Sequence, residues 1–233
     1  MANPAVNLNL PAHASRTRWR QIALAPGSMH GWLTDRGSLT RRLKKASKRF
    51  QVVRLAQGRG GVCIDEVACL APPVSGAAGT MATRSVSQRT FGFLVRQVLL
   101  ECDGRPTVFA HSVIDARALA GGWRWLAGLG ARPLGEALFN DPRVRRGPLA
   151  FRRLRAPDPR YLRAASALAA RGLPVPSGLW ARRSVFTAGH WQLLVTEVFL
   201  PAVACLDPAG APASAGGPLG LPEPVNHEHT DGR

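Results

Sequence analysis

The sequence predicts an α+β fold, a single domain in which helices pack on an antiparallel sheet. Two long segments, 90–114 and 178–202, each hold two apolar runs around a short turn signal, which is the pattern of a β-hairpin. Segments with helical periodicity lie before and between these hairpins. Hairpins interleaved with helices are typical of an antiparallel sheet covered by helices. A chain of 233 residues, 45% of them hydrophobic, can build a sizeable core.

The first elements are expected between residues 37 and 61. Residues 37–50 predict a helix that Ser38 can cap. Its apolar positions share one helical face: Leu39, Leu43 and Ala46. Residues 51–61, QVVRLAQGRGG, predict a strand followed by a turn. The end of this stretch, GRGG at 58–61, lacks the lysine and the serine or threonine of a phosphate-binding loop, so we interpret it as the turn.

The remaining elements follow in order along the chain. The first hairpin turns within CDGRP, 102–106, because Asp-Gly is a strong turn signal. Residues 121–139 predict a helical segment, a glycine-rich break and a second short helix from about Pro133. Residues 158–171 predict another helix, which ends at the glycine that follows. The second hairpin turns near Ala188-Gly189.

Both ends of the chain are expected to lie outside the folded domain, which should span residues 21–206. Residues 1–20 are polar and unpatterned, and residues 207–233 are rich in proline, glycine and alanine and lack aromatics. Such segments cannot bury enough apolar surface to offset their ordering entropy, so we predict that both are disordered. No signal peptide and no apolar stretch of about 18 residues is present, so no membrane insertion is expected.

The net charge of +17 raises the question of a nucleic-acid partner. Of the 31 basic residues all but Lys44, Lys45 and Lys48 are arginines, and alanine, glycine and proline are abundant. This composition is typical of a GC-rich coding sequence and needs no anionic polymer to explain it. We therefore expect no nucleic-acid binding, although short basic clusters are present.

The cysteines and histidines predict neither a disulfide framework nor a metal site. None of the four cysteines forms a C-x-x-C pair: Cys63, Cys69, Cys102 and Cys205. Four reduced thiols in a cytoplasmic protein are expected. His227 and His229 are close together but lie in a polar tail, where we expect them to be solvated. His111 and His190 lack recognisable catalytic neighbours, so structural or surface roles are expected.

A single carboxylate interrupts the apolar run LLVTEVFLPA, residues 193–202. Side chains alternate across a strand, so Glu197 shares a face with Val195 and Phe199. The other face of this run is also largely apolar. A buried carboxylate is costly unless it is paired or strongly hydrogen-bonded, so a protein group or a ligand must meet Glu197.

Arg96 is the matching anomaly, a cation in the middle of a strand on one face with Leu94 and Val98. A buried ion pair with Glu197 would hold two strands together. Alternatively, the guanidinium group binds a substrate carboxylate, and Glu197 accepts a hydrogen bond from a substrate hydroxyl. Arg182 and Arg183 alternate across their strand, so at most one faces such a pocket. One of them could hold a second carboxylate, but a solvated role is expected for each.

Five segments occur in order along the body of the chain: GSLTRRL at 37–43, LVRQVLLECDGRP at 94–106, RPLGEALF at 132–139, LWARRSVF at 179–186 and LLVTEVFLP at 193–201. Together they resemble the chorismate pyruvate-lyase family, bacterial enzymes that make 4-hydroxybenzoate for ubiquinone. The resemblance covers roughly residues 30–202, and five ordered blocks are far more specific than one. It implies a compact α+β domain with an antiparallel sheet of about six strands, monomeric in most members.

The resemblance also implies a site. Arg96 and Glu197 match the family residues that contact the ligand, and they are the expected catalytic residues. Leu134 matches a leucine that binds the ligand largely through its backbone. A further contact comes from a methionine in the family sequence S-M-T, where this chain has Leu39. If the backbone N–H makes that contact, the change matters little, and if the side chain packs on the ring, the pocket changes shape slightly.

The implied activity is the cofactor-independent conversion of chorismate to 4-hydroxybenzoate and pyruvate, the first step of ubiquinone biosynthesis. Aromatisation of the ring supplies much of the driving force, so no metal or redox group is required. Two alternatives remain. A non-enzymatic sensor domain could bind a small aromatic carboxylate, but the residues before Trp32 are too few for a DNA-binding domain. A basic nucleic-acid-binding protein would leave Arg96 and Glu197 unexplained.

Overall fold

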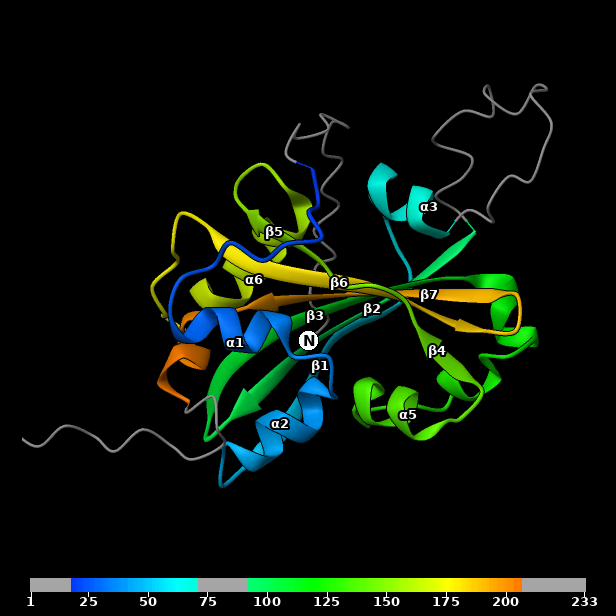
Figure 1. Cartoon of the computed structure of the whole chain (residues 1–233), viewed down its shortest axis with the longest axis horizontal. Helices are drawn as coiled ribbons and strands as arrows, with labels where there is room; N and C mark the ends of the chain where they lie inside the picture. Colours follow the sequence, from blue (N-terminus) through cyan, green and yellow to red (C-terminus); the bar gives the residue numbers. More distant parts are fainter. Residues whose placement is uncertain (1–17, 71–91, 207–233) are drawn as a thin grey trace, which may run out of the picture.

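The computed structural model describes residues 18–70 and 92–206, which form one sheet with helices on both faces (Figure 1). The predicted disordered segments 1–20 and 207–233 lie outside the described residues, except for 18–20. Within 18–20, the backbone of Arg20 pairs with that of Phe151.

All strand pairs in the described sheet are antiparallel, so the predicted fold class is confirmed. Six of the seven strands follow the order β1-β2-β3-β7-β6-β4, and the remaining strand, β5, also pairs with β6. The strands are β1 (Phe50–Arg59), β2 (Phe93–Cys102), β3 (Arg105–Asp115), β4 (Val144–Arg146), β5 (Ala150–Leu154), β6 (Leu179–Ala188) and β7 (Trp191–Phe199).

Five α-helices and three short 3₁₀ helices complete the described part of the chain. The α-helices are α1 (Ser28–Thr34), α2 (Leu39–Lys45), α3 (Ile64–Leu70), α5 (Leu134–Asn140) and α6 (Pro159–Ala169). The 3₁₀ helices are η1 (Ala116–Ala120), η2 (Arg124–Leu126) and η3 (Pro201–Cys205).

Both predicted hairpins are present, and backbone conformation explains their turns. Asp103 and Gly104 connect β2 to β3 with φ values of 50° and 78°, the left-handed pair that suits a tight hairpin turn. Gly189, with φ of 60°, and His190 connect β6 to β7. The expected turn at 58–61 is partly wrong, because β1 continues through Arg59 and pairs with β2.

The predicted helices at 37–50, from Pro133 and at 158–171 are present as α2, α5 and α6, but α2 ends at Lys45, well before residue 50. The helical segment expected after Gly121 contains only the 3₁₀ helix η2. Ser38 caps α2, since its Oγ accepts a hydrogen bond from the N–H of Arg41 at 3.3 Å. The predicted helix at 158–171 is α6, which Asp158 caps. Gly172 follows α6 with φ of 65°, as a helix end requires.

The two faces of the sheet carry different layers. The face that holds Glu197, the Glu197 face, is covered by α1, α2 and α5 through clusters built on Leu43 and Leu138. The opposite face, the His111 face, is covered by α6 and α3. Figure 1 shows α2 and α5 on one side of the sheet and α3 on the other.

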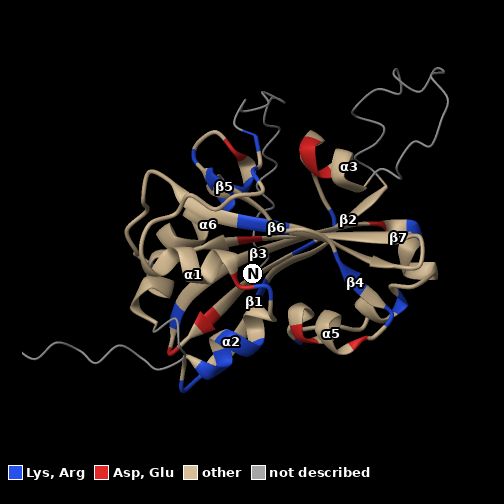
Figure 2. Cartoon of the chain, viewed as in Figure 1, with Lys and Arg blue, Asp and Glu red and all other residues tan. Residues whose placement is uncertain are grey.

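Basic side chains are spread over several described elements, among them α2, β4 and β6, with acidic side chains between them (Figure 2). Exposed arginines pair with nearby carboxylates, as Arg117 does with Asp115 and Arg143 with Asp141. Among the described helices, none has both the length and the apolar character needed to cross a membrane.

Candidate active site

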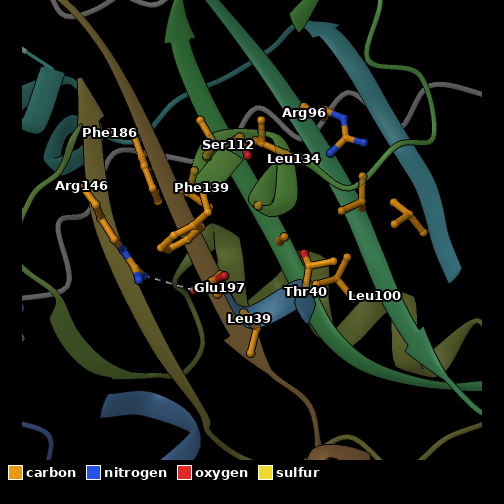
Figure 3. Close-up of a pocket in the computed structure, with 16 residues that line it drawn as sticks. Leu39, Thr40, Arg96, Leu100, Ser112, Leu134, Phe139, Arg146, Phe186 and Glu197 are labelled. Atoms are coloured by element: carbon orange, nitrogen blue, oxygen red, sulfur yellow. Dashed lines mark ion pairs between the residues drawn. The ribbon is translucent and has the colours of Figure 1, made fainter. Parts of the chain in front are cut away.

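A cavity opens on the Glu197 face between the sheet and the first turns of α2 and α5 (Figure 3). The space between its lining side chains is about 500 Å³ with the open mouth included, and about 30 Å³ of it can hold the centre of a water molecule. Most of its wall is apolar, from strands and helices alike: Val52, Val98, Leu100, Ala110, Leu138, Phe139, Phe186 and Val195. Such a surface suits a flat ring, and polar groups at a few points would fix its orientation.

Arg96 lines this cavity from β2 and is only 8% exposed. Its Nη2 donates hydrogen bonds to the carbonyl oxygens of Gly130 and Arg132, both at 3.1 Å. Its Nε is buried and has no hydrogen-bond partner among the described residues. Burial lowers the pKa of Arg96, and the like charge of Arg54 adds to this. The guanidinium group is thus held in place by backbone carbonyls, and no carboxylate within 18–70 or 92–206 pairs with it.

Glu197 lines the cavity from β7, and its protein partner is Arg182 on the neighbouring strand. The two residues are directly opposite in the β6–β7 register, and Arg182 Nε donates to Glu197 Oε2 at 2.6 Å. Arg182 is fully buried. Its Nη1 donates to three carbonyl oxygens around the end of α1, those of Trp32, Leu33 and Asp35. Glu197 therefore has a buried cation beside it on the neighbouring strand, and this cation does not itself line the cavity.

The predicted alternative of an Arg96–Glu197 ion pair is not what the structure contains. β3 lies between β2 and β7, and the register places Arg96 opposite Ser112 and Ser112 opposite Val195. Two strand spacings of about 4.8 Å and two residues of about 3.4 Å put the Cα atoms of Arg96 and Glu197 roughly 12 Å apart. Both side chains instead belong to the wall of one cavity, at separate positions (Figure 3).

The expected solvated roles of Arg182 and Arg183 are wrong. Arg182 is buried beside Glu197, and Arg183 on the His111 face donates to Asp65 Oδ2 at 2.8 Å. Alternation across β6 does separate the two side chains, so that only one lies on the cavity side of the sheet. The residues of this strand alone did not predict that each arginine would form an ion pair with a carboxylate.

Arg146 is a lining residue that the sequence analysis missed. Its Nη2 lies 4.0 Å from Glu197 Oε2, an ion pair drawn in Figure 3. Its Nε donates to Ser184 Oγ at 2.8 Å, and its guanidinium carbon lies 5.4 Å from the ring centres of Phe139 and Phe186. Burial lowers the pKa of Arg146, and attraction to Glu197 opposes this. Arg146 is one of three arginines within four residues, on a three-residue strand, and this pattern does not single it out for the role.

Leu39 and Leu134 also line the cavity, each as the first residue of its helix. The first N–H groups of a helix have no partner within the helix, so these two can donate toward a ligand. Both side chains are buried, Leu39 with 3% and Leu134 with 6% exposure. The structure thus brings together the three residues predicted for the site, Arg96, Leu134 and Glu197, and places Leu39 in the same cavity wall.

A family model for chorismate lyase matches residues 10–205 of this chain. The chain belongs to the chorismate lyase family. Among its relatives, a probable chorismate pyruvate-lyase of Thiobacillus denitrificans is 46% identical over 180 residues. The matched region covers 77% of this chain and 86% of the relative. Another of that name, from Azoarcus sp., is 43% identical over 204 residues, or 87% of this chain and 96% of the relative.

Solved structures similar to this member of the chorismate lyase family include domains of transcriptional regulators. One is the ligand-binding domain of a putative GntR-family regulator from Bordetella bronchiseptica, with a TM-score of 0.41 and 14% identity, covering 66% of this chain and 85% of that one. Another is the C-terminal domain of the histidine utilization repressor from Pseudomonas syringae, with a TM-score of 0.43 and 8% identity, covering 76% and 100%.

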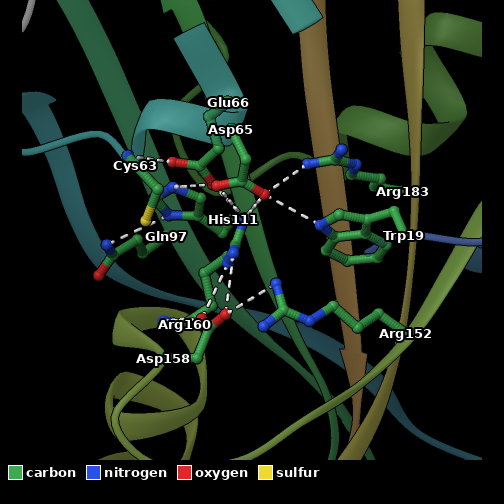
Figure 4. Close-up of polar contacts among 10 residues, drawn as sticks. All are labelled: Trp19, Cys63, Asp65, Glu66, Gln97, His111, Arg152, Asp158, Arg160 and Arg183. Atoms are coloured by element: carbon green, nitrogen blue, oxygen red, sulfur yellow. Dashed lines mark hydrogen bonds and ion pairs between the residues drawn. The ribbon is translucent and has the colours of Figure 1, made fainter. Parts of the chain in front are cut away.

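The histidines of this lyase-family chain lie away from the cavity. His111 is 1% exposed on the opposite face of the sheet, where its Nε2 lies 3.3 Å from Glu66 Oε1 and its Nδ1 lies 3.3 Å from Gln97 (Figure 4). His190 is exposed in the β6–β7 turn. The predicted structural or surface roles agree with these positions. Among residues 18–70 and 92–206, no group of three acidic, histidine or cysteine side chains could hold a metal ion, and all four cysteines are free.

Proposed function

We propose that this protein is a chorismate pyruvate-lyase, which converts chorismate to 4-hydroxybenzoate and pyruvate. The observation that carries the proposal is the apolar cavity with Arg96 and Glu197 in its wall. Each of the two is fixed by other protein groups, Arg96 by backbone carbonyls and Glu197 by Arg182, and each still faces the cavity. Membership of the chorismate lyase family supports the same substrate.

The substrate matches the polar groups of the cavity. Chorismate carries a carboxylate on its ring, a hydroxyl para to it, and an enolpyruvyl ether on the carbon beside the hydroxyl. Arg96 binds the ring carboxylate, since its buried Nε has a proton to donate. Both arginines near Glu197 approach its Oε2, which leaves Oε1 to accept the hydrogen bond of the ring hydroxyl. The N–H groups of Leu39 and Leu134 add donors at the cavity wall.

The reaction needs positioning and electrostatics more than a strong acid or base. The ether carbon–oxygen bond breaks, the ring carbon that bears the hydroxyl loses its hydrogen, and the ring becomes aromatic. Atoms balance when one proton reaches the methylene carbon of the departing enolpyruvate, which then leaves as pyruvate. Aromatisation supplies much of the driving force, so we expect no metal or nucleotide to be required.

The product keeps the two groups that Arg96 and Glu197 bind, the carboxylate and the hydroxyl. We therefore expect 4-hydroxybenzoate to be retained tightly and its release to limit turnover. Loss of the contact to Arg96 in Arg96→Ala should weaken product binding by roughly 2–5 kcal/mol, because the arginine is almost fully buried. Glu197→Gln keeps the shape of the side chain, so its main loss should appear in turnover.

The test incubates the purified full chain with chorismate and measures both products. Equal amounts of 4-hydroxybenzoate, by chromatography, and pyruvate, by a coupled dehydrogenase assay, are expected, unchanged by EDTA. A sample without protein corrects for spontaneous decay of chorismate, and Arg96→Ala should approach that background. Tight binding of 4-hydroxybenzoate without any conversion would favour the alternative of a sensor domain for aromatic carboxylates.

The proposal of a chorismate pyruvate-lyase also includes the predicted cytoplasmic location and monomeric state.

A further inference from the structure

The cavity has an excess of positive charge that one carboxylate of a substrate would not balance. Among the described residues that line it, Arg96, Arg146 and Glu197 carry charge. Arg182 pairs with Glu197 at 2.6 Å, so it already neutralises the glutamate. Two cations, Arg96 and Arg146, therefore remain for a ligand, which is the charge pattern expected for a substrate with two carboxylates.

We propose that Arg146 binds the carboxylate of the enolpyruvyl group of chorismate, an inference that rests on the proposed function. The geometry of the substrate points to this arginine. The ether that carries the enolpyruvyl group is on the ring carbon next to the hydroxyl. With the ring carboxylate at Arg96 and the hydroxyl at Glu197, the enolpyruvyl group must lie beside Glu197. Arg146, with Nη2 4.0 Å from Glu197 Oε2, is the cation at that place.

The guanidinium group of Arg146 is held in one orientation before any ligand arrives. Nε donates to Ser184 Oγ at 2.8 Å, and Nη1 donates to the carbonyl oxygen of Arg36 at 3.0 Å. The rings of Phe139 and Phe186, which also line the cavity, lie against the group. These contacts leave Nη2 directed toward Glu197, as Figure 3 shows. A cation fixed in this way loses little further conformational freedom when a carboxylate binds.

A purely structural role for Arg146 makes a different prediction from a substrate-binding role. If Arg146 only supports Glu197, its loss weakens every ligand whose hydroxyl contacts Glu197, the product included. If it binds the enolpyruvyl carboxylate, its loss weakens chorismate alone, because 4-hydroxybenzoate lacks that group. The ratio of the two affinities therefore separates the roles.

The experiment compares Arg146→Gln with Arg145→Gln, a change at the neighbouring exposed position of β4. Steady-state kinetics give kcat and KM for chorismate, and titration calorimetry gives Kd for 4-hydroxybenzoate. For Arg146→Gln we expect kcat/KM to fall by at least ~30-fold, with a change in the Kd of the product of less than ~3-fold. Arg146→Lys should recover part of the loss, since it keeps a cation but not the planar fork. Arg145→Gln should match the wild type.

Two results would overturn the inference while the proposed function stands. The first is an equal loss of affinity for chorismate and for 4-hydroxybenzoate, and the second is an unchanged KM in a folded Arg146→Gln protein. A thermal melt checks folding, and Arg146→Lys carries the same comparison if the glutamine variant unfolds. Failure of the wild-type protein to release pyruvate would instead contradict the proposed function itself.

Discussion

Glu197 shows how a single buried carboxylate can serve both a fold and a ligand. Arg182 donates to it from β6 and to three carbonyl oxygens near the end of α1, so this arginine joins two strands and a helix. Arg96, two strands away, takes no part in that group of contacts and is held by the loop before α5. Arg96 and Glu197, the two charged residues within apolar strands, are thus held in place by different groups of the protein.

This separation predicts two different outcomes in double-mutant cycles. Arg182→Met and Glu197→Gln should be coupled by about 1–3 kcal/mol in the free energy of unfolding, because the side chains are in direct contact. Arg96→Met and Glu197→Gln should add to within about 0.5 kcal/mol, since they share no partner. Urea unfolding followed by tryptophan fluorescence measures both cycles. A coupling between Arg96 and Glu197 as large as that of the first pair would contradict the arrangement described above.

The sequence could place Glu197 on a buried face but could not name its partner, and the reason is the strand register. A turn formed by Gly189 and His190 pairs Ala188 with Trp191, and six residues further along each strand it pairs Arg182 with Glu197. The expected turn, near Ala188-Gly189, is close to this position but does not fix the register. A shift of a hairpin by one residue changes every cross-strand neighbour, so the partner depends on a detail that residue patterns fix poorly.

At the scale of elements, the first turns of α2 and α5 form part of the cavity wall. The shape of the cavity therefore depends on where these two helices lie. α2 begins at Leu39 because Ser38 caps it. Lys44 of α2 and Glu136 of α5 form an ion pair at 2.7 Å on the exposed side of this helix pair. The cap and the ion pair both act on the two helices that close the cavity.

Removal of the cap should therefore affect stability and ligand binding together. Ser38→Ala loses the hydrogen bond to the N–H of Arg41 and should cost about 1 kcal/mol of unfolding free energy. A modest weakening of 4-hydroxybenzoate binding should accompany it, because Leu39 and Thr40 then move more freely. Ser166→Ala, an exposed change within α6, is the control. Chemical denaturation and product titration are the measurements, and a Ser38→Ala protein as stable as the control would show that the cap contributes nothing.

Elements with local signals could be predicted from the sequence, and elements without them could not. The Asp-Gly turn, the capped helix α2 and the glycine after α6 each depend on residues within one segment. α1 and α3 have seven residues each, β4 has three, and β5 has five. β4 and β5 both pair with β6, which begins 25 residues or more after they end. Their formation therefore depends on contacts with a distant part of the chain and not on a local signal.

At the scale of the whole molecule, the sheet separates a cavity on one face from a buried network of charges on the other. In that network Arg160 of α6 donates to Asp158, and it also contacts Glu66 of α3, which lies against His111 of β3 (Figure 4). Asp65 accepts from Trp19, near the start of the described chain, and from Arg183 of β6. These contacts fasten the covering layer to the sheet directly behind the cavity.

Glu66 is the buried carboxylate on which this network depends. Burial by itself raises the pKa of its carboxyl group. Attraction to His111 and the hydrogen bond with it, the charge of Arg160 and the N–H of Cys63 outweigh that effect and lower the pKa of Glu66 to about 2. The same surroundings raise the pKa of the Cys63 thiol to about 12, with burial as the main cause, so this thiol stays protonated at neutral pH.

The network predicts a loss of stability in acid that begins on the side of the sheet away from the cavity. A carboxyl group whose pKa is lower in the folded state than in the unfolded chain stabilises the fold above its unfolded pKa, and this contribution disappears as the pH falls toward the folded value. For Glu66 the pH window runs from its ordinary pKa of 4.5 down to about 2, and the contribution to the free energy of unfolding is about 3 kcal/mol.

Glu66→Gln should be less stable than the wild type at pH 7 and should lose less stability between pH ~5 and pH ~3. Glu136→Gln, which removes a half-exposed carboxylate of α5 outside this network, serves as the control. Urea unfolding at a series of pH values gives the slopes, and equal slopes for Glu66→Gln and the wild type would mean that another carboxylate governs unfolding in acid.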